Sequence, residues 1–248
     1  MKHNNKQYSL AAKLVVLAAF LFSGSVYSAE FSVNPVRIYI DGKAKTGSLV
    51  VENPGDQPVT IQATMNSWSH ANDKEQIVPS DDLVVSPPIF KVQPKTKQVV
   101  RIGFLKKPDV SKEGTYRLYL QEVPAPRKAD DQGMGVTLRM SLPVFIAPAS
   151  GRAQSELKWK AEPLDDTRIK LSFSNAGNAH IQITAINVGL PDGTTLAGIP
   201  AMMTYILPGQ SYSWDMKTEK PWKREALRVM IKSDIAAPGV ETEVKPES

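Results

Sequence analysis

The stretch LVVENPGDQPVTIQ, residues 49–62, decides the fold because it has a near copy, LSFSNAGNAHIQIT, at residues 171–184. In each copy two short apolar runs flank a turn of the form Asn-x-Gly, at residues 53–55 and 175–177. Apolar and polar residues alternate on both sides of the turn, which is the pattern of half-buried β-strands. Each copy therefore predicts two strands joined by a tight turn.

A second pair of stretches repeats in the same order. FKVQPKTKQVVRI at residues 90–102 corresponds to TYILPGQSYSWDM at residues 204–216, with Pro94 aligned with Pro208. The shared order and rough spacing of the two pairs predict two similar domains. Chance similarity between turn-rich strands is the alternative explanation.

The boundary between the domains is expected in APASGRAQ, residues 147–154, a small-residue and polar stretch suited to a linker. This places an N-terminal domain at residues 29–149 and a C-terminal domain at residues 150–248. Outside the first residues of the chain, no stretch has convincing helical periodicity, whereas short alternating runs punctuated by Pro, Gly and Asn recur throughout. We predict an all-β fold of two β-sandwiches.

The first 28 residues have the layout of a secretory signal. Lys2 and Lys6 open a basic stretch, the apolar run LVVLAAFLF follows at residues 14–22, and small and turn-forming residues come next. Cleavage is expected after Ser28, with cleavage after Ala29 as the alternative. An uncleaved anchor is disfavoured, because spanning a bilayer takes about 20 apolar residues.

Composition excludes several classes of function. The chain has no cysteine, so an exported protein of this sequence has neither disulfides nor thiolate chemistry. Without the three lysines of residues 1–29, the balance is 27 basic to 25 acidic residues. This mild excess gives little support to a nucleic-acid partner, and we expect neither a nucleic-acid partner nor stable membrane insertion.

Catalytic and metal-binding patterns are missing from the sequence. Beyond the signal there are two histidines, His70 and His180, each in a polar, turn-like context, without metal-ligand spacing. No GxSxG elbow or phosphate-binding glycine loop is present. We therefore expect no enzyme activity, no metal site and no cofactor. An exported hydrolase is the weakest alternative.

The stretch GMGVTLRMSLPVFIAP, residues 133–148, carries an unusual strand pattern. Apolar and polar residues alternate along it, yet Pro143 lies within the run and cannot donate a ladder hydrogen bond. Such prolines are tolerated on edge strands and at bulges. A long apolar strand at an edge invites pairing with another chain, so its position calls for a partner or a cover.

Five stretches, taken in order, resemble the PapD-like family of periplasmic pilus-assembly chaperones of the chaperone–usher pathway. They are NPVRIYIDG (34–42), VVENPGDQPVTIQATMNSW (50–68), PPIFKVQPKTKQVVRI (87–102), YRLYLQEVPAP (116–126) and LPVFIAP (142–148). The resemblance covers most of residues 31–148 and is weaker in the second domain. It implies two immunoglobulin-like domains in an L-shaped, or boomerang, arrangement with a cleft between them.

The resemblance also implies how the last strand of the first domain is used. Members of the family lend this strand to an incomplete pilus subunit, and alternating apolar side chains fill the subunit's open groove. The match places Met134, Val136 and Leu138 at the inserted positions, followed by Met140. The alternative is that these side chains cover the protein's own core, which we prefer for Leu142, Val144 and Ile146.

Two basic residues anchor the terminal carboxylate of the subunit in this family. Arg37 matches the first, and an arginine suits the role because its planar fork binds a carboxylate bidentately. The second is a lysine on the last strand, where this sequence has Pro143. Arg117 is the preferred substitute, because alternation turns it outward from a central strand. Arg101 and Arg139 are the further substitutes, and an arginine without a role is the alternative for Arg37.

The missing lysine and the YR pair at residues 116–117 resemble the archaic or alternative branch of the family. The implied protein is periplasmic, caps and folds pilus (fimbrial) subunits, and delivers them to an outer-membrane usher. The alternative from another class is an exported adhesive or structural β-sandwich module. The short segment before residue 31 speaks against a pilin, because pilins carry an N-terminal extension of alternating residues.

Overall fold

The computed structural model describes residues 31–44, 46–71, 74–107, 109, 111–124, 136–234 and 240–245. The expected signal and Met134 lie outside the described residues. Every regular element among the described residues is a β-strand, which confirms the predicted all-β class.

The first half of the chain forms two sheets. One has the strand order β1-β3-β8-β6. Its strands are β1 (Ser32–Asn34), β3 (Thr46–Glu52), β8 (Lys97–Phe104) and β6 (Leu83–Ser86). The other has the order β2-β10-β9-β4-β5, and β7 pairs with β4. Its strands are β2 (Ile38–Ile40), β10 (Arg139–Ile146), β9 (Gly114–Glu122), β4 (Val59–Ala71), β5 (Lys74–Pro79) and β7 (Ile89–Val92).

The second half forms two further sheets. A three-stranded sheet has the order β11-β12-β16, with β11 (Leu157–Asp165), β12 (Arg168–Asn175) and β16 (Ser211–Lys217). The other has the order β14-β13-β17-β18, and β15 pairs with β13. Its strands are β14 (Thr195–Ile199), β13 (Ile181–Gly189), β17 (Leu227–Ser233), β18 (Val240–Val244) and β15 (Thr204–Ile206).

Each pair of sheets encloses its own hydrophobic core. In the first sandwich Val51 and Val100 of one sheet and Leu118 of the other are fully buried. In the second, Leu171 and Val229 are fully buried between the two sheets. Side chains alternate between the two faces of a strand, so the period of two in the sequence becomes one buried and one outward face. The boundary proposed at residues 149 and 150 lies between β10 and β11 and stays a prediction.

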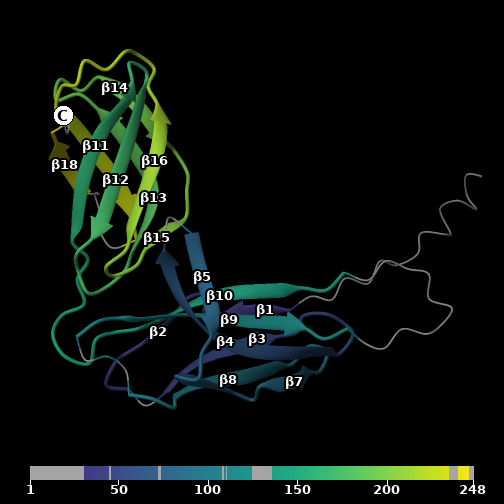
Figure 1. The fold of residues 1–248 in the computed structure, drawn as a ribbon. Coiled ribbons are helices and arrows are strands. Elements are labelled where there is room, and N and C mark those ends of the chain that lie inside the picture. Colours follow the sequence, from purple (N-terminus) through teal and green to yellow (C-terminus); the bar gives the residue numbers. More distant parts are fainter. Residues whose placement is uncertain are drawn as a thin grey trace, which may run out of the picture.

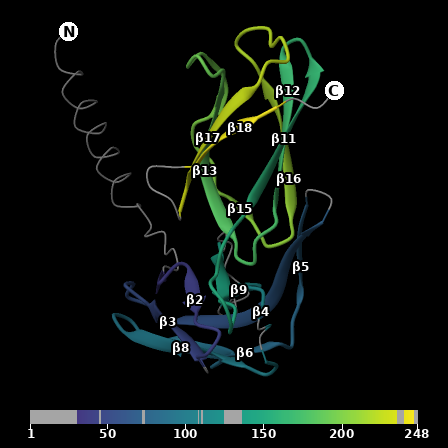
Figure 2. The ribbon, with the colours of Figure 1, turned by 90° about the vertical axis from the view of Figure 1, so that its left-hand side faces the viewer.

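Figure 1 shows the first sandwich lying across the base of the second, and Figure 2 shows the same junction from the side. Strand β4 is 13 residues long, and with β5 it extends toward the second sandwich in both views. At its far end the His70 ring contacts the edge of the Tyr212 ring on β16, with centroids 6.4 Å apart. The junction is therefore formed by side chains of both sandwiches.

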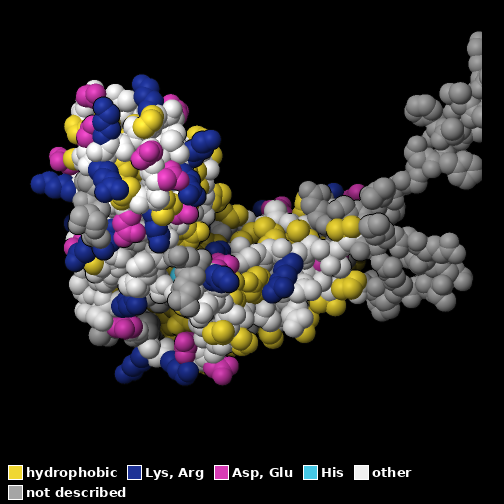
Figure 3. All heavy atoms as spheres, turned by 45° about the horizontal axis from the view of Figure 1, so that its top comes forward, with side chains coloured by type: hydrophobic (Ala, Val, Ile, Leu, Met, Phe, Trp, Pro, Cys, Tyr) yellow, Lys and Arg dark blue, Asp and Glu magenta, His cyan; other side chains and the backbone are white. Residues whose placement is uncertain are grey.

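Hydrophobic side chains are unevenly exposed on the surface. Figure 3 shows them gathered on the first sandwich, from the junction outward, whereas charges of both signs are scattered over the second. No helix within the described part of the chain is long and apolar enough to cross a membrane.

Candidate functional site

Arg37 lies where the first strand leaves one sheet and joins the other, between β1 and β2. Its Nη1 donates to the Asp234 carboxylate (2.7 Å) and to the Tyr39 hydroxyl (3.1 Å). Its Nη2 donates to the side-chain oxygen of Gln182. Since Asp234 and Gln182 belong to the second sandwich, Arg37 connects the two sandwiches at their junction.

Arg117 lies on β9 directly across from Pro143 of β10. Its neighbour Leu118 points into the core, so the arginine points outward, as alternation predicts. Nη2 donates to Glu75 at 2.9 Å, and the guanidinium carbon lies 3.7 Å from the centroid of the Trp68 ring. Contact with the ring face is a cation–π interaction, which holds the charge in place beside the junction.

The ring of Tyr205, on β15, brings the two arginines together. The guanidinium carbon of Arg37 lies 5.4 Å from the Tyr205 centroid and that of Arg117 lies 5.9 Å from it. Trp68 contacts the same ring edge-on, and Phe145 packs beside it, with centroids 5.3 and 5.6 Å away. Burial raises the pKa of the Tyr205 hydroxyl, and the positive charge of Arg37 opposes that shift.

His180 follows a turn and has a polar neighbour, as predicted, but it is buried; the turn-like setting predicted for His70 is wrong, because His70 lies in β4. It lies just before β13, and its ring stacks on Phe145 with centroids 3.5 Å apart and an interplanar angle of 9°. Nδ1 lies 2.7 Å from Glu113 Oε2, and the backbone N–H of His180 donates to the same oxygen at 2.8 Å. His70 is half-buried at the end of β4, where burial lowers the pKa of its imidazole. Both histidines are thus packed at the junction.

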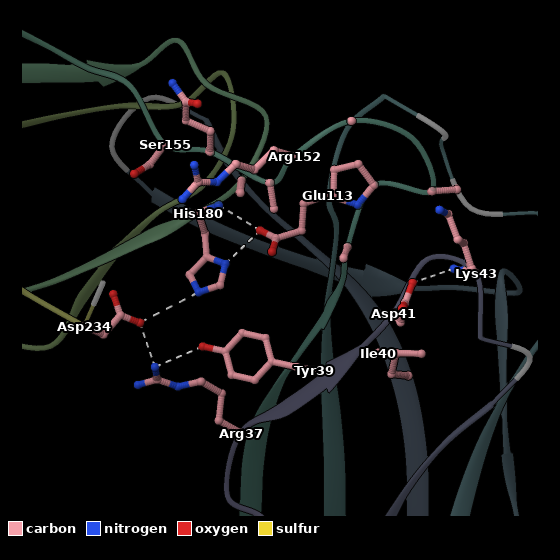
Figure 4. A pocket seen from close by; sticks show the side chains of 17 residues that line it. Arg37, Tyr39, Ile40, Asp41, Lys43, Glu113, Arg152, Ser155, His180 and Asp234 are labelled. Carbon is pink, nitrogen blue, oxygen red and sulfur yellow. Dashed lines mark hydrogen bonds and ion pairs between the residues drawn. The ribbon is translucent and has the colours of Figure 1, made fainter. Parts of the chain in front are cut away.

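A cavity of about 1050 Å³ opens beside Arg37 and His180, between the first strands, the linker and the second sandwich. Figure 4 shows Arg37, Tyr39, Glu113, His180 and Asp234 directed toward one another across it. Arg152 of the linker and Lys43 also line the cavity. Arg117 is not among the lining residues, so the two arginines share the Tyr205 ring but not the cavity.

Hydrogen-bonding capacity remains unused at this junction. Five buried side-chain polar atoms among the described residues lack a hydrogen-bond partner, and four of them lie here. These are Trp68 Nε1, Arg117 Nε, Gln182 Nε2 and His180 Nε2. The first three are obligate donors. A buried donor without an acceptor is costly, so the junction is suited to a ligand that brings acceptor oxygens.

The apolar residues expected to enter a subunit differ in their surroundings. Val136 precedes β10 and is 76% exposed. Leu138 and Met140 are partly buried and pack against the core of the first sandwich, whereas Leu142 is buried in it. Val144 and Ile146 are fully buried, in agreement with the preference for a core role there.

Arg139 and Arg101, the two further substitutes for the second anchor residue, lie away from the junction. Arg139 begins β10, and its guanidinium carbon lies 4.1 Å from the ring centroid of Tyr119 on the neighbouring strand. Arg101 is exposed on β8, in the other sheet of the first sandwich. Neither has an interaction with Tyr205 or Asp234 like that of Arg37. In the described part of the chain, no group of His, Cys, Asp and Glu is arranged to hold a metal ion.

Several residues of the site carry no signal in the sequence. Asp234, Gln182 and Glu113 stand in ordinary polar stretches, and Tyr39 and Tyr205 read as members of alternating strands. The sequence gives a hint only for Tyr205, which lies in TYILP, the counterpart of FKVQP in the repeat.

Fold and site together define a binding protein of two β-sandwiches, with two arginines and unpartnered donors at the junction. Residues 30–152 match the family described as "Pili and flagellar-assembly chaperone, PapD N-terminal domain". The chaperone protein PapD of Escherichia coli is 27% identical over 60% of this chain and 61% of its own length. The chaperone protein LpfB of Salmonella typhimurium is 24% identical over 72% of this chain and 71% of its own. Residues 30–152 therefore belong to the PapD-like chaperone family, and the chain spans less than two thirds of the length of PapD.

Solved structures share the fold. The chain resembles the crystal structure of the CsuC-CsuE chaperone-tip adhesion subunit pre-assembly complex from the archaic Csu pili of Acinetobacter baumannii. The TM-score is 0.66 at 18% identity, covering 89% of this chain and 100% of that one. For the Pseudomonas aeruginosa CupB2 chaperone the TM-score is 0.56 at 19% identity, covering 87% and 100%. The two sandwiches are therefore immunoglobulin-like, as the resemblance implies.

Proposed function

We propose that this protein is a periplasmic chaperone that binds pilus subunits, caps them by donating strand β10, and delivers them to an outer-membrane usher. The terminal carboxylate of the subunit is held at Arg37 and Arg117. The protein acts by binding and carries out no chemical step, and the free energy for release comes from subunit folding and strand exchange. Pro143 and Arg117 favour the archaic or alternative branch.

The observation that carries the proposal is the incomplete pairing of β10. The whole strand pairs with β9 on one side, from Arg139 to Ile146. On the other side β2 pairs only with Val144 to Ile146. Among the described residues, no strand pairs with the backbone from Arg139 to Pro143 on that side, next to the exposed Val136. An extended segment of another chain can add there as a new strand, with main-chain hydrogen bonds supplying affinity.

The surroundings of the two arginines support their role as the anchor. Both guanidinium groups lie largely out of solvent, with 26% of the Arg37 side chain and 15% of the Arg117 side chain exposed. Arginine keeps its charge in such places, and a carboxylate brings oxygens for the unpartnered donors beside it. Loss of one arginine would leave the carboxylate partly unpaired, at a cost of about 3 kcal/mol, or more than a hundredfold in Kd.

The test is co-purification from the periplasm with subunits encoded by neighbouring genes. We expect recovery of a subunit with the unaltered protein and its loss with Arg37→Ala or Arg117→Ala. Arg101→Ala, on the far sheet, is the matched control and should recover the subunit normally. Recovery with all three variants would contradict the anchor assignment but not the chaperone role.

A second pair of variants tests the strand. Val136→Asp should abolish recovery without unfolding the protein, because the side chain is exposed. Ile89→Asp, at a 58% exposed position on β7, is the matched control. Equal recovery with both would contradict strand donation at Val136. Absence of any partner under all conditions would favour an exported adhesive or structural module.

A further inference from the structure

Arg37 is already occupied by a carboxylate of its own chain. Asp234 follows β17, and its Oδ2 lies 2.7 Å from Arg37 Nη1. Its Oδ1 accepts the backbone N–H of Gln182 at 2.9 Å, and only 14% of the side chain is exposed. An incoming carboxylate at Arg37 would meet Asp234 in place, and two carboxylates sharing one site repel each other.

His180 offers Asp234 a second position. Its Nε2 is buried, has no hydrogen-bond partner, and lies 4.0 Å from Asp234 Oδ2. The ring is held by Glu113 on its other nitrogen and by the parallel ring of Phe145, so Nε2 keeps its direction. The same Asp234 oxygen therefore stands between a guanidinium on one sandwich and an imidazole on its own.

The proton on His180 decides whether this second position is favourable. Glu113 Oε2 accepts from the backbone N–H of His180 and faces Nδ1 of its ring, so the hydrogen of the neutral ring is on Nδ1. Nε2 then presents a lone pair, which repels a carboxylate. With a proton on Nε2, the ring becomes a cation that can donate to Asp234. The charged and titratable groups around the ring are Glu113, Tyr39, Tyr205, Asp234, its partner Arg37, and Arg152 across the cavity.

We propose that Asp234 holds Arg37 in the free protein as an internal substitute for a subunit carboxylate, and turns to protonated His180 when that carboxylate arrives. The proposal rests on the proposed function, because it concerns the same anchor. Binding at Arg37 then takes up one proton from solvent onto His180 Nε2. Affinity for a carboxylate consequently rises as the pH falls, since proton uptake is linked to binding.

The test uses a short lysine-tagged peptide in which valine alternates with threonine, made with a free terminal carboxylate and with a terminal amide. Calorimetric titration of the purified chain from pH 8 to about pH 5, in buffers of different ionisation heat, gives both Kd and proton uptake. We expect the acid peptide to bind about tenfold more tightly at the acid end, with proton uptake. The amide peptide should bind more weakly and without this dependence.

Three variants locate the effect. Asp234→Asn keeps an acceptor for the Gln182 N–H but removes the competing charge, so the acid peptide should bind tightly at every pH. His180→Gln should bind weakly at every pH, because Asp234 has no second position. His70→Gln is the matched control, since this histidine lies at the same junction but outside the Asp234 contacts, and it should keep the pH dependence.

The outcomes separate this proposal from the function on which it rests. Tighter binding of the acid than of the amide peptide, with equal affinity at all pH values, would overturn the exchange and leave the anchor standing. Retained pH dependence in His180→Gln would also overturn the exchange. Equal binding of the two peptides, or binding of neither, would overturn the carboxylate anchor and the exchange together.

Discussion

The two Asn-x-Gly turns are built from the same atoms but are placed in different surroundings. In the first sandwich the buried Asn53 amide donates to the carbonyls of Gln57 (2.7 Å) and Val92 (3.1 Å). Its oxygen accepts the N–H of Gly55 at 2.9 Å. This turn serves its own sandwich, joining β3, β4 and the end of β7.

In the second sandwich the buried Asn175 repeats each of these bonds. Its amide donates to the carbonyls of Ala179 (2.7 Å) and Ile206 (3.1 Å), and its oxygen accepts the N–H of Gly177 at 3.0 Å. The same oxygen also accepts the N–H of Glu156, at 3.1 Å, from the segment that links the sandwiches. The repeat seen in the sequence is thus confirmed atom by atom, with one addition.

The additional bond gives the second turn a role that the first turn lacks. The linker packs on the second turn, and the N–H of Glu113 donates to Asn178 O in the same turn at 2.9 Å. Glu113 in turn binds His180, two residues further along. One copy of the turn therefore supports a sandwich, while the other also holds the junction where the site lies.

The largest expected difference concerns the two glycines of these turns. A Cβ on Gly177 would lie 2.2 Å from Gln154 O and 2.7 Å from Glu156 N, which are backbone atoms of the linker. A Cβ on Gly55 would meet only the Asn53 side chain, at 3.1 Å. We expect Gly177→Ala to lower the free energy of unfolding by about 3 kcal/mol and Gly55→Ala by less than about 1 kcal/mol. Denaturant unfolding measures both, and equal losses would contradict the difference drawn between the turns.

Next come the asparagines themselves. Asn53→Ala removes the donor to the carbonyls of Gln57 and Val92, of which the second bond is buried, and should cost about 2 to 3 kcal/mol. Asn175→Ala should cost about 1 kcal/mol more, because the Glu156 N–H also loses its acceptor. Thermal unfolding of the two variants provides the measurement. A greater loss at Asn53 would mean that the linker bond contributes nothing.

A smaller effect is expected where the backbone is left-handed in both copies. Gly209 has φ = +75°, and Lys95 occupies the corresponding turn with φ = +58°. We expect Gly209→Ala to destabilise the protein by about 1 kcal/mol, and Lys95→Gly to stabilise it by less than that. The exposed ion pair of Lys95 with Asp56 contributes little against this gain. Destabilisation by Lys95→Gly would show that the lysine's bond to the Pro54 carbonyl outweighs the strain.

The smallest effect is expected at His70, which contacts Tyr212 across the junction. Tyr212 occupies the repeat position of Gln98 in the first sandwich. Burial lowers the pKa of His70, with Arg117 lowering it further and Glu75 opposing. The unfolded chain therefore takes up a proton first as the pH falls below about 6.5, which destabilises the folded protein. His70→Gln should remove this acid-side loss, a gain of less than about 1 kcal/mol for a half-exposed group. Unfolding at pH 7.5 should show no such gain, and a gain there would contradict the assignment.

Strands and cores could be predicted because their signal is local. Alternation with period two places Val51, Leu118 and Leu171 in the cores without any knowledge of distant contacts. The outward direction of Arg117 follows from the same rule. The asparagine turns were predictable for a similar reason, since their bonds to the following glycine span two residues.

The junction could not be predicted in this way, because its contacts join distant parts of the chain. Arg37 and Asp234 are separated by 197 residues, and Glu113 and His180 by 67. The resemblance to a family supplied Arg37 and directed attention to Arg117, but it gave no indication of Asp234. The turn before His180 was visible in the sequence, but its burial was not, because Phe145 of the other sandwich packs on the ring.

The pairing of Pro143 with Arg117 has a consequence for subunit selection in cells that assemble more than one kind of pilus. Relative to the lysine of the resembling family, the positive charge is displaced by one strand, about 5 Å across the sheet. Under the proposed function, a subunit tail shaped for a cation on the last strand would find the cation on the neighbouring strand instead. The position of the cation would then contribute to which subunits each chaperone binds.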